Sequence, residues 1–449
     1  MNHAQRTTLC ALLTLGCACA WAGTPLAQDT RATKTQPSPF TSRIDQDLRT
    51  LTSQELLGRG PDTEGLEHAR DWVRRRFRGL GLEPAIGDDV LQAVPGVTVS
   101  AKILPDTELQ LGRRVLARGV EYDVWPKSAS GSLTGRARVV KANWSPAEAK
   151  GRLLVVRASS ARTQQAVVDR AISHGAKGVV LVLDGALRRG EHLRPTQRDV
   201  TIPVLRVRAH VLEELAQGRS EIAVRGVVSI ERRTATLHNV LAKLPGSPKK
   251  GNPLIIAAHY DGMGLGYLSR DPETRGALHP SADDNASGVA VMLDVAARLA
   301  RTPNATWRRP VWVAALTGEE LGLVGSRHLS TTLSAGTEVL TLDMLGRAEL
   351  RPVAVMTNEP GSDLSNTLTR ELRKGAAEVV LRPWRESRSD HLAFIDAGCT
   401  SVHLTTGRSA VMHTIRDEAR RIDAPALERV AATLATALMA HVRAPKTAR

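Results

Sequence analysis

Strand-length apolar runs alternate with longer amphipathic segments in the second half of the chain. The runs are almost continuous in Val, Leu, Ile and Ala, a pattern typical of parallel strands buried on both faces. The longer segments repeat their apolar residues at the spacing of a helix. From residue 234 onward we therefore expect an α/β fold, a mostly parallel sheet flanked by helices on both faces. The expected strands are NPLIIAAHYD, RPVWVAALTG, TEVLTLDML and CTSVHLTT, and the expected helices are SGVAVMLDVAARLAR and APALERVAATLATALMAHV.

An amphipathic helix is also expected nearer the amino terminus. Between residues 64 and 82 the apolar positions recur at helical spacing, and Gly79 and Gly81 mark the end of the pattern. We assign residues 43–82 to the same domain as the parallel sheet, as its N-terminal helical part. The apolar positions that define this helix are Leu66, Ala69, Trp72, Val73 and Phe77.

Residues 83–233 have a different texture, with shorter apolar runs separated by Gly, Ser and Arg. Strand-like and helix-like runs alternate here as well, which predicts an inserted, smaller α/β domain. The histidines of this stretch are isolated from other metal-binding side chains, so we interpret them as surface or structural residues. They are His174, His192 and His210.

The amino-terminal residues 1–22 have the pattern of a secretory signal peptide. Weakly basic MNHAQRTT precedes the apolar stretch LCALLTLGCACAWA, and Ala20-Trp21-Ala22 supplies a small-x-small cleavage site. The apolar stretch is shorter than the roughly 20 residues of a membrane-spanning helix, so we expect a secreted or periplasmic protein with no stable membrane span. Residues 23–42 are rich in Thr, Pro, Gln and Ser and predict a flexible leader.

The cysteine content and the charge distribution indicate whether disulfides, a lipid anchor or a nucleic-acid partner are to be expected. If Cys10, Cys17 and Cys19 leave with the signal peptide, only Cys399 remains, and no intramolecular disulfide can form. Lipid attachment at Cys17 or Cys19, giving a lipoprotein, is the alternative at this end of the chain. The formal net charge is +15, but the arginines are spread along the chain and aromatic residues make up only 3% of it, so we expect no nucleic-acid partner.

Metal-binding side chains stand at the ends of the apolar runs. The carboxyl ends of parallel strands border one crevice, so these side chains can meet although they are far apart in sequence. Two imidazoles and several carboxylates, one of them left free to move a proton, are what a two-metal hydrolytic centre needs. The residues are His259, Asp261, Asp284, Glu319, Glu320, Asp343 and His413.

Each motif taken alone also has an interpretation without chemistry. His259 and Asp261 are two residues apart, which along a strand sends both side chains to one face, but this spacing is common by chance. Asp284 could belong to a turn in which Ser287 caps the next helix, and the adjacent glutamates could be a solvated pair. Asp343 is the most informative single residue, because a carboxylate inside the apolar string LTLDML needs a partner and a metal is a suitable one.

In this order the motifs AAHYDG, SADDNASG, LTGEELG, LDMLG and MHTIRDE resemble those of the zinc-dependent aminopeptidase family, the co-catalytic dizinc exopeptidases related to glutamate carboxypeptidase and glutaminyl cyclase. The resemblance covers residues 234–442, and LTSQELLGRG near the start is similar to the family's amino-terminal segment. It implies a zinc-exopeptidase-like fold with two divalent metal ions, expected to be Zn²⁺. It also implies the ligands: His259 and Asp343 for one ion, Glu320 and His413 for the other, and Asp284 as the bridge.

The same resemblance implies roles for further residues. Glu319 would be the general base, and Asp261 would hold the imidazole two residues before it. The peptide bond between Asp284 and Asn285 would be cis. The segment SDHLAF is similar to a family segment near the substrate pocket, although we do not expect its His391 to be a ligand.

Residues 83–233 resemble a protease-associated domain, in which a strand, a helix ending in HGAKG and two further strands follow one another. The expected organisation is therefore a signal peptide at 1–22, a flexible leader at 23–42, a helical part at 43–82, the protease-associated domain at 83–233 and the dimetal peptidase domain at 234–449.

The resemblance implies a secreted aminopeptidase that hydrolyses the N-terminal peptide bond of peptides or proteins through a metal-bridging water. A carboxypeptidase or dipeptidase on the same centre, a single-zinc glutaminyl cyclase and a noncatalytic binding protein on this scaffold are the alternatives. The chain departs from many relatives at Gly262-Met263-Gly264 and at Met412, which are not expected ligands and concern the shape of the pocket. The motifs leave open the preferred terminal residue, the native metal and the oligomeric state.

Overall fold

The structure is a computed structural model that describes residues 42–443, apart from 142, 159, 186, 188–189, 196, 198, 249, 270–271, 303–306 and 376–377. The expected signal peptide with Cys10, Cys17 and Cys19, and the expected leader up to residue 41, lie outside the described residues. Among the helices that the structure describes, none has both the length and the apolar composition needed to cross a membrane.

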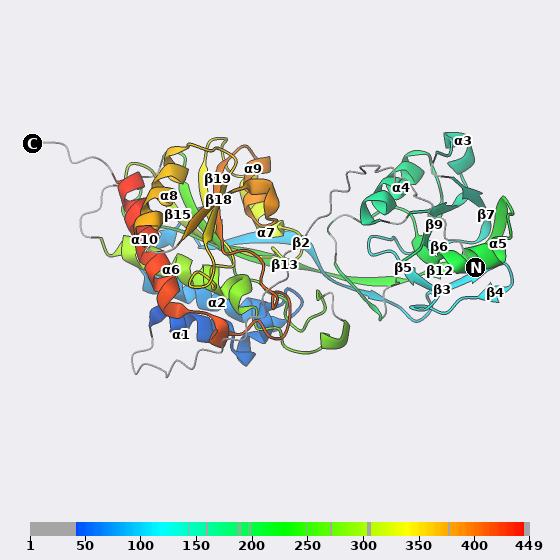
Figure 1. The fold of residues 1–449 in the computed structure, drawn as a ribbon, viewed down its shortest axis with the longest axis horizontal. Coiled ribbons are helices and arrows are strands. Elements are labelled where there is room, and N and C mark those ends of the chain that lie inside the picture. Colours follow the sequence, from blue (N-terminus) through cyan, green and yellow to red (C-terminus); the bar gives the residue numbers. More distant parts are fainter. Residues whose placement is uncertain are drawn as a thin grey trace, which may run out of the picture. The chain divides into compact units, whose positions relative to one another are not determined.

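One part of the fold is built around a large mixed sheet (Figure 1). In sheet order its strands are β10 (His192–Leu193), β2 (Leu91–Ile103), β13 (Ile230–Lys243), β15 (Val311–Leu316), β14 (Leu254–His259), β16 (Glu338–Leu342), β19 (Thr400–Thr405), β17 (Val353–Thr357) and β18 (Val379–Pro383), and β1 (Glu83–Pro84) pairs with β13. Strands β15, β14, β16 and β19 are parallel to one another. Their neighbours β13 and β17 are antiparallel to them, so the four predicted strands form a parallel centre within a mixed sheet.

Helices cover both faces of this sheet, as the sequence predicted. Successive strand residues point to opposite faces, and along β14 this places Ile256 in the larger core and Ile255 in the smaller one. The larger core is covered by α1 (Arg43–Leu51), α2 (Glu64–Gly79), α6 (Gly288–Ala300), α8 (Asp363–Gly375) and α10 (Ala424–Val442), and the smaller by α7 (Val324–Ser330) and α9 (His391–Asp396).

Helix α2 is the amphipathic helix expected near the amino terminus. Its apolar stripe is buried, and Phe77 and Val73 are completely inaccessible to solvent. Burying one side chain of this size contributes about 2 kcal/mol. The buried side chains of the stripe together favour packing of the helix on the sheet, although its outer face is strongly charged. The helix ends at Gly79, and Gly81 then adopts φ 70, a left-handed conformation that costs glycine little.

Residues 108–228 contain a second sheet and three helices. In sheet order its strands are β4 (Arg114–Val115), β3 (Glu108–Leu111), β12 (Glu221–Val228), β7 (Gly135–Val140), β8 (Leu153–Arg157), β9 (Gly178–Leu183), β11 (Val204–Arg208) and β5 (Tyr122–Val124), with β6 (Gly131–Ser132) beside β12. The helices of this part are α3 (Pro146–Ala149), α4 (Ala161–Ser173) and α5 (Ala209–Ala216). The sheet is shorter than the expected segment 83–233, because β2 and β13 at its two ends pair with each other in the large sheet. That this part is a protease-associated domain stays a prediction.

The connection between β9 and β11 returns to the large sheet. His192 and Leu193 form β10 there, and the ring of His192 lies 4.4 Å from the ring of Tyr267. Arg194 then donates a hydrogen bond from Nη2 to the backbone carbonyl of Glu320 at 2.8 Å. The chain of the smaller sheet thereby contacts one of the predicted metal ligands.

Candidate metal centre

The predicted site residues follow four neighbouring parallel strands. His259 is the last residue of β14, Asp343 follows β16 directly, and Glu319 and Glu320 come shortly after β15. His413 lies in the loop after β19. The carboxyl ends of parallel strands share one edge of a sheet, and Asp284 reaches this edge from the segment Ala282–Ser287 ahead of α6.

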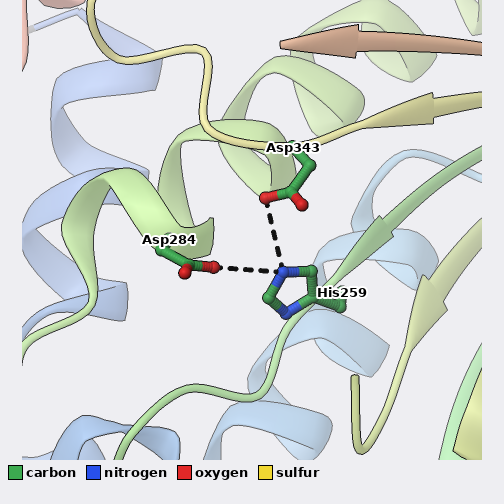
Figure 2. Close-up of side chains that lie close together, drawn as sticks. All are labelled: His259, Asp284 and Asp343. Carbon is green, nitrogen blue, oxygen red and sulfur yellow. Dashed lines mark ion pairs between the residues drawn. The ribbon is translucent and has the colours of Figure 1, made fainter. Parts of the chain in front are cut away.

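His259 lies between two carboxylates (Figure 2). Its Nε2 atom is 3.3 Å from Oδ1 of Asp284 and 3.5 Å from Oδ1 of Asp343. The three side chains are buried and come from a strand end, the start of a helical segment and the residue after a strand. Their ligand atoms all lie within 4.8 Å of one another, close enough to hold one metal ion.

A second cluster shares Asp284. Nε2 of His413 is 3.0 Å from Oδ2 of Asp284 and 3.0 Å from Oε1 of Glu320. Asp284 therefore directs one oxygen to each histidine and belongs to both groups. A carboxylate in this position can bridge two cations.

The donor atoms of both clusters fit metal ions. Both ring nitrogens of His259, Oδ1 of Asp343 and Oε1 of Glu320 are buried and make no hydrogen bond to any described residue. Leaving buried polar atoms without partners is costly, and an ion held by imidazole and carboxylate ligands would satisfy them. Burial by itself would raise the pKa of Asp284, but the neighbouring imidazoles of His259 and His413 hold that pKa below the usual range, in the ionised form that a ligand needs.

Asp261 supports the site through three contacts. Its Oδ1 atom lies 3.5 Å from Nδ1 of His259 and accepts the backbone N–H of Glu319 at 3.1 Å. Its Oδ2 atom accepts the backbone N–H of Glu320, also at 3.1 Å. The sequence indicated only the contact with the imidazole, and the two backbone contacts show that Asp261 also fixes the loop that carries the two glutamates.

Glu319 belongs to neither group of candidate ligands. Burial raises the pKa of its carboxyl well above the usual value; His259 acts in the opposite direction, while Glu320 and Asp390 raise it further. A carboxylate with a raised pKa is a stronger base. Glu319 therefore lies beside the candidate ligands with a carboxyl that holds a proton more strongly than usual.

The backbone around Asp284 is held by a residue that the sequence did not indicate. Asp417 accepts the backbone N–H of Asp283 at 2.9 Å and that of Asp284 at 3.1 Å. The peptide bond between Asp284 and Asn285 is cis, as expected. The side chain of Asn285 donates to the carbonyl of Leu342, the residue directly before the candidate ligand Asp343. The two ligand-bearing segments are thus tied together through the backbone.

Left-handed backbone conformations gather around the same ligands. Ser281, Met344 and His413 have φ of 53, 55 and 60, a region that L-residues other than glycine rarely adopt. Such conformations cost about 1–3 kcal/mol each and persist where the surroundings determine them, often at functional sites.

His391 lies apart from both groups. Its Nε2 atom pairs with the carbonyl of Trp384 at 3.0 Å, and its ring stacks on that of His403 with the centroids 4.2 Å apart. It appears in neither cluster of candidate ligands among the described residues.

Comparison with known proteins identifies the part of the chain that carries this site. Residues 239–438 match peptidase family M28. The match covers a little less than half of the chain. It includes all seven predicted site residues, from His259 to His413.

Curated proteins similar to this chain include peptidases from bacteria and fungi. The aminopeptidase YwaD of Bacillus subtilis is 27% identical over 276 residues, which cover 58% of this chain and 54% of that protein. A probable zinc metalloprotease of Pyricularia oryzae is 27% identical over 314 residues, which cover 59% of this chain and 58% of that protein. The chain spans about half the length of the curated relatives it matches.

Solved structures share the fold over most of the chain. An aminopeptidase from Aneurinibacillus sp. strain AM-1 superposes with a TM-score of 0.63 at 18% identity, covering 91% of this chain and 95% of that one. The zinc aminopeptidase BSAP from Bacillus subtilis gives a TM-score of 0.58 at 18% identity, covering 92% and 98%. At this level of identity the likeness shows that the fold is shared.

Proposed function

We propose that this protein is a dizinc aminopeptidase that hydrolyses the N-terminal peptide bond of peptides or proteins. The observation that carries the proposal is the arrangement of Asp284, whose two carboxylate oxygens face two separate groups of ligands. The match to peptidase family M28 and the relatives described as an aminopeptidase and as probable zinc metalloproteases support it.

The donor sets define which residues would hold the ions. His259 and Asp343 would hold one zinc, Glu320 and His413 the other, and Asp284 both. Bound there, two zinc ions would supply Lewis acidity toward a carbonyl oxygen and lower the pKa of a shared water.

Proton transfer falls to Glu319 in this proposal. Its carboxylate accepts a proton from the attacking water as the water oxygen bonds to the peptide carbon. It then delivers that proton to the nitrogen of the leaving amine as the C–N bond breaks, so the products are a free amino acid and a shortened peptide. Asp261 keeps this carboxylate in place because it accepts the backbone N–H of Glu319.

Export from the cytoplasm is part of the same proposal. The signal-peptide pattern in residues 1–22 supports a secreted or periplasmic enzyme, and cleavage after Ala22 is the expected processing step. Amino-terminal sequencing of the protein purified from the culture medium or periplasm tests this. A mature chain that begins at Cys17 or Cys19 and carries a lipid would replace it with the lipoprotein alternative.

The activity is tested with aminoacyl-anilides, with peptides blocked at either end, and with glutamine-initiated peptides, each with and without a chelator. We expect hydrolysis that requires a free amino terminus, stops with the chelator and returns with zinc. Activity that requires a free carboxyl terminus would indicate the carboxypeptidase or dipeptidase alternative. Cyclisation without hydrolysis, with one zinc per chain, would indicate a glutaminyl cyclase.

A variant of the proposed base separates metal binding from catalysis. Glu319→Gln is expected to keep both zinc ions, because it is not a proposed ligand, and to lose turnover by about 10²- to 10⁴-fold, the usual contribution of general-base catalysis. Glu378→Gln, at an exposed position, is the control and should behave as the wild type. Full turnover in Glu319→Gln would refute the assigned base.

A further inference from the structure

The segment LGRG near the amino terminus packs backbone against backbone on the loop that follows His259. The N–H of Gly262 donates to the carbonyl of Arg59 at 3.1 Å, and the N–H of Gly264 donates to the carbonyl of Gly58 at 3.1 Å. Glycine permits this approach, because a Cβ on Gly60 would lie 2.6 Å from Cα of Gly264. The loop after a predicted zinc ligand is therefore bound to a segment about 200 residues earlier in the chain.

Arg59 projects from this segment into the interior and is completely buried. Its Nε atom donates to the carbonyl of Tyr260 at 2.8 Å. Its Nη2 atom donates to the carbonyl of Ser281 at 2.7 Å, and Nη1 donates to the carbonyl of Pro280 at 3.1 Å and to that of Leu51. Tyr260 lies directly after the ligand His259, and Ser281 lies three residues before Asp284, so one guanidinium contacts both ligand-bearing loops.

The charge of Arg59 matches its surroundings. Burial lowers its pKa to about 10, while Asp261, Asp417 and Asp284 act in the opposite direction, so the guanidinium is charged at neutral pH. Its five N–H groups form a rigid planar fork, which fixes the directions of several acceptors at once. A flexible ammonium in the same place could not hold all of these carbonyls in one geometry.

We propose that Arg59 is a positioning residue for the zinc centre, setting the separation between the loop of His259 and the loop of Asp284. The inference rests on the proposed function, because it assumes that these two residues share a zinc ion. It assigns a role to the amino-terminal LTSQELLGRG motif, which otherwise has no part in the chemistry. Arg59 would act through the two loops and touch neither the substrate nor the metal.

The test replaces the planar guanidinium of Arg59 with a lysine ammonium, which keeps a positive charge. Arg59→Lys is expected to weaken zinc affinity by about 10- to 100-fold, the usual cost of losing a group that orients metal ligands. Zinc affinity is measured on the metal-free full chain by competition with a chromophoric chelator, and thermal unfolding is measured on the same samples. At saturating zinc we expect kcat to fall with little change in KM, because the substrate contacts remain.

The matched control is Arg206→Lys. Arg206 is also a largely buried arginine with a bidentate partner, Asp123, but it lies on β11 of the second sheet. It should lose stability and keep wild-type zinc affinity. If Arg59→Lys loses stability to the same extent and also keeps wild-type zinc affinity, Arg59 has only a structural role and the inference is overturned.

A second variant reaches the same contact from the backbone. Gly60→Ala places a methyl group against Gly264 and should displace the LGRG segment while Arg59 remains. We expect Gly60→Ala to weaken zinc affinity, as Arg59→Lys should. If Arg59→Lys does not fold, Gly60→Ala is the variant that tests the inference. Unchanged zinc affinity in Gly60→Ala would then overturn the inference.

The outcome for the wild type separates this inference from the proposed function. Wild-type protein that binds no zinc would overturn the proposed function and the inference together. Wild-type protein that binds two zinc ions, with variants that bind them equally well, would overturn the inference alone.

Discussion

One carboxylate oxygen of Asp261 accepts the backbone N–H of Glu319 at 3.1 Å. The two residues follow different strands, β14 and β15, which are parallel neighbours in the sheet. The hydrogen bond therefore ties the proposed base to the strand that ends in the ligand His259. The position of the base depends on a residue that takes no proton itself.

Replacing Asp261 with asparagine tests this dependence. The amide has a single acceptor oxygen for the two backbone N–H groups that Asp261 now accepts, and its NH₂ would face one of them. We expect Asp261→Asn to lower kcat and zinc affinity, each by about 10- to 100-fold. Steady-state kinetics at saturating zinc and chelator competition measure the two effects.

Asp45→Asn is the control for this variant. Asp45 pairs with Arg49 in the exposed part of α1, so its loss should change neither quantity. Wild-type kcat in Asp261→Asn would contradict the role that we assign to the contact with Glu319.

In the proposed function, the number of bound zinc ions depends on Asp284. Asparagine at this position offers one oxygen and one NH₂ group, so it cannot ligate two cations as a carboxylate can. We expect Asp284→Asn to bind at most one zinc per chain, and elemental analysis of the dialysed protein measures this.

Its neighbour Asp283 provides the matched control. Burial raises the pKa of Asp283 to about 7, with Asp417 raising it as well, so this side chain is partly neutral near pH 7. A neutral amide should fit there, and Asp283→Asn should keep two zinc ions. Two zinc ions in Asp284→Asn, or their loss only in Asp283→Asn, would reverse the choice of bridging residue.

The convergence of the ligands was predictable because it follows from the strands. His259 and Asp343 end or follow almost continuous apolar runs of strand length, a pattern typical of buried parallel strands, and such strands end at one edge. The helix around Val73 and Phe77 was also predictable from the sequence. Its apolar residues recur regularly at helical spacing, and the segment contains no run of β-branched residues that would favour a strand.

The residues that hold the ligands in place were not predictable. Arg59 and Asp417 interact mainly with backbone groups of segments far away in sequence. Every residue has a backbone carbonyl, so the residue types of the partner segments do not reveal such contacts. The pairing of β2 with β13 in the large sheet was also not predictable, because these strands have the same pattern of short apolar runs as the strands between them.

Zinc binding should release protons. Burial by itself would lower the pKa of His413, but Glu320 and Asp284 raise it to about 11; burial also opposes the shift of His259, whose pKa the surrounding carboxylates raise well above the usual value. Both imidazoles are therefore protonated in the metal-free protein at neutral pH. A ligand must be deprotonated to bind, so zinc affinity should increase as the pH rises through the neutral range and fall as the pH drops.

Calorimetry in buffers of different ionisation enthalpy counts these protons. We expect each imidazole to release about one proton per chain at pH 7. In His413→Ala the number should be lower than in the wild type by about one, because the imidazole of His413 is missing. Zinc binding without proton release, or with an affinity that does not change with pH, would contradict protonated imidazoles in the metal-free site.

The contact between Arg194 and Glu320 links the smaller sheet to the metal centre. Arg194 lies on the connection between β9 and β11, is partly buried and donates to the carbonyl of Glu320. A hydrogen bond from a charged group contributes about 1.5–3 kcal/mol, so its loss should loosen the loop that carries Glu320. We expect Arg194→Met to weaken zinc binding by about tenfold, as for other groups that orient ligands.

The weakening should be confined to the ion held by Glu320 and His413, because Arg194 does not contact the other group. Binding isotherms of the metal-free protein separate the two ions by their affinities. Arg233→Met is the control, since Arg233 donates in the same way to the carbonyl of Asp62, away from both groups of ligands. If Arg194→Met and Arg233→Met both bind two zinc ions as tightly as the wild type, the smaller sheet does not support the centre through this contact.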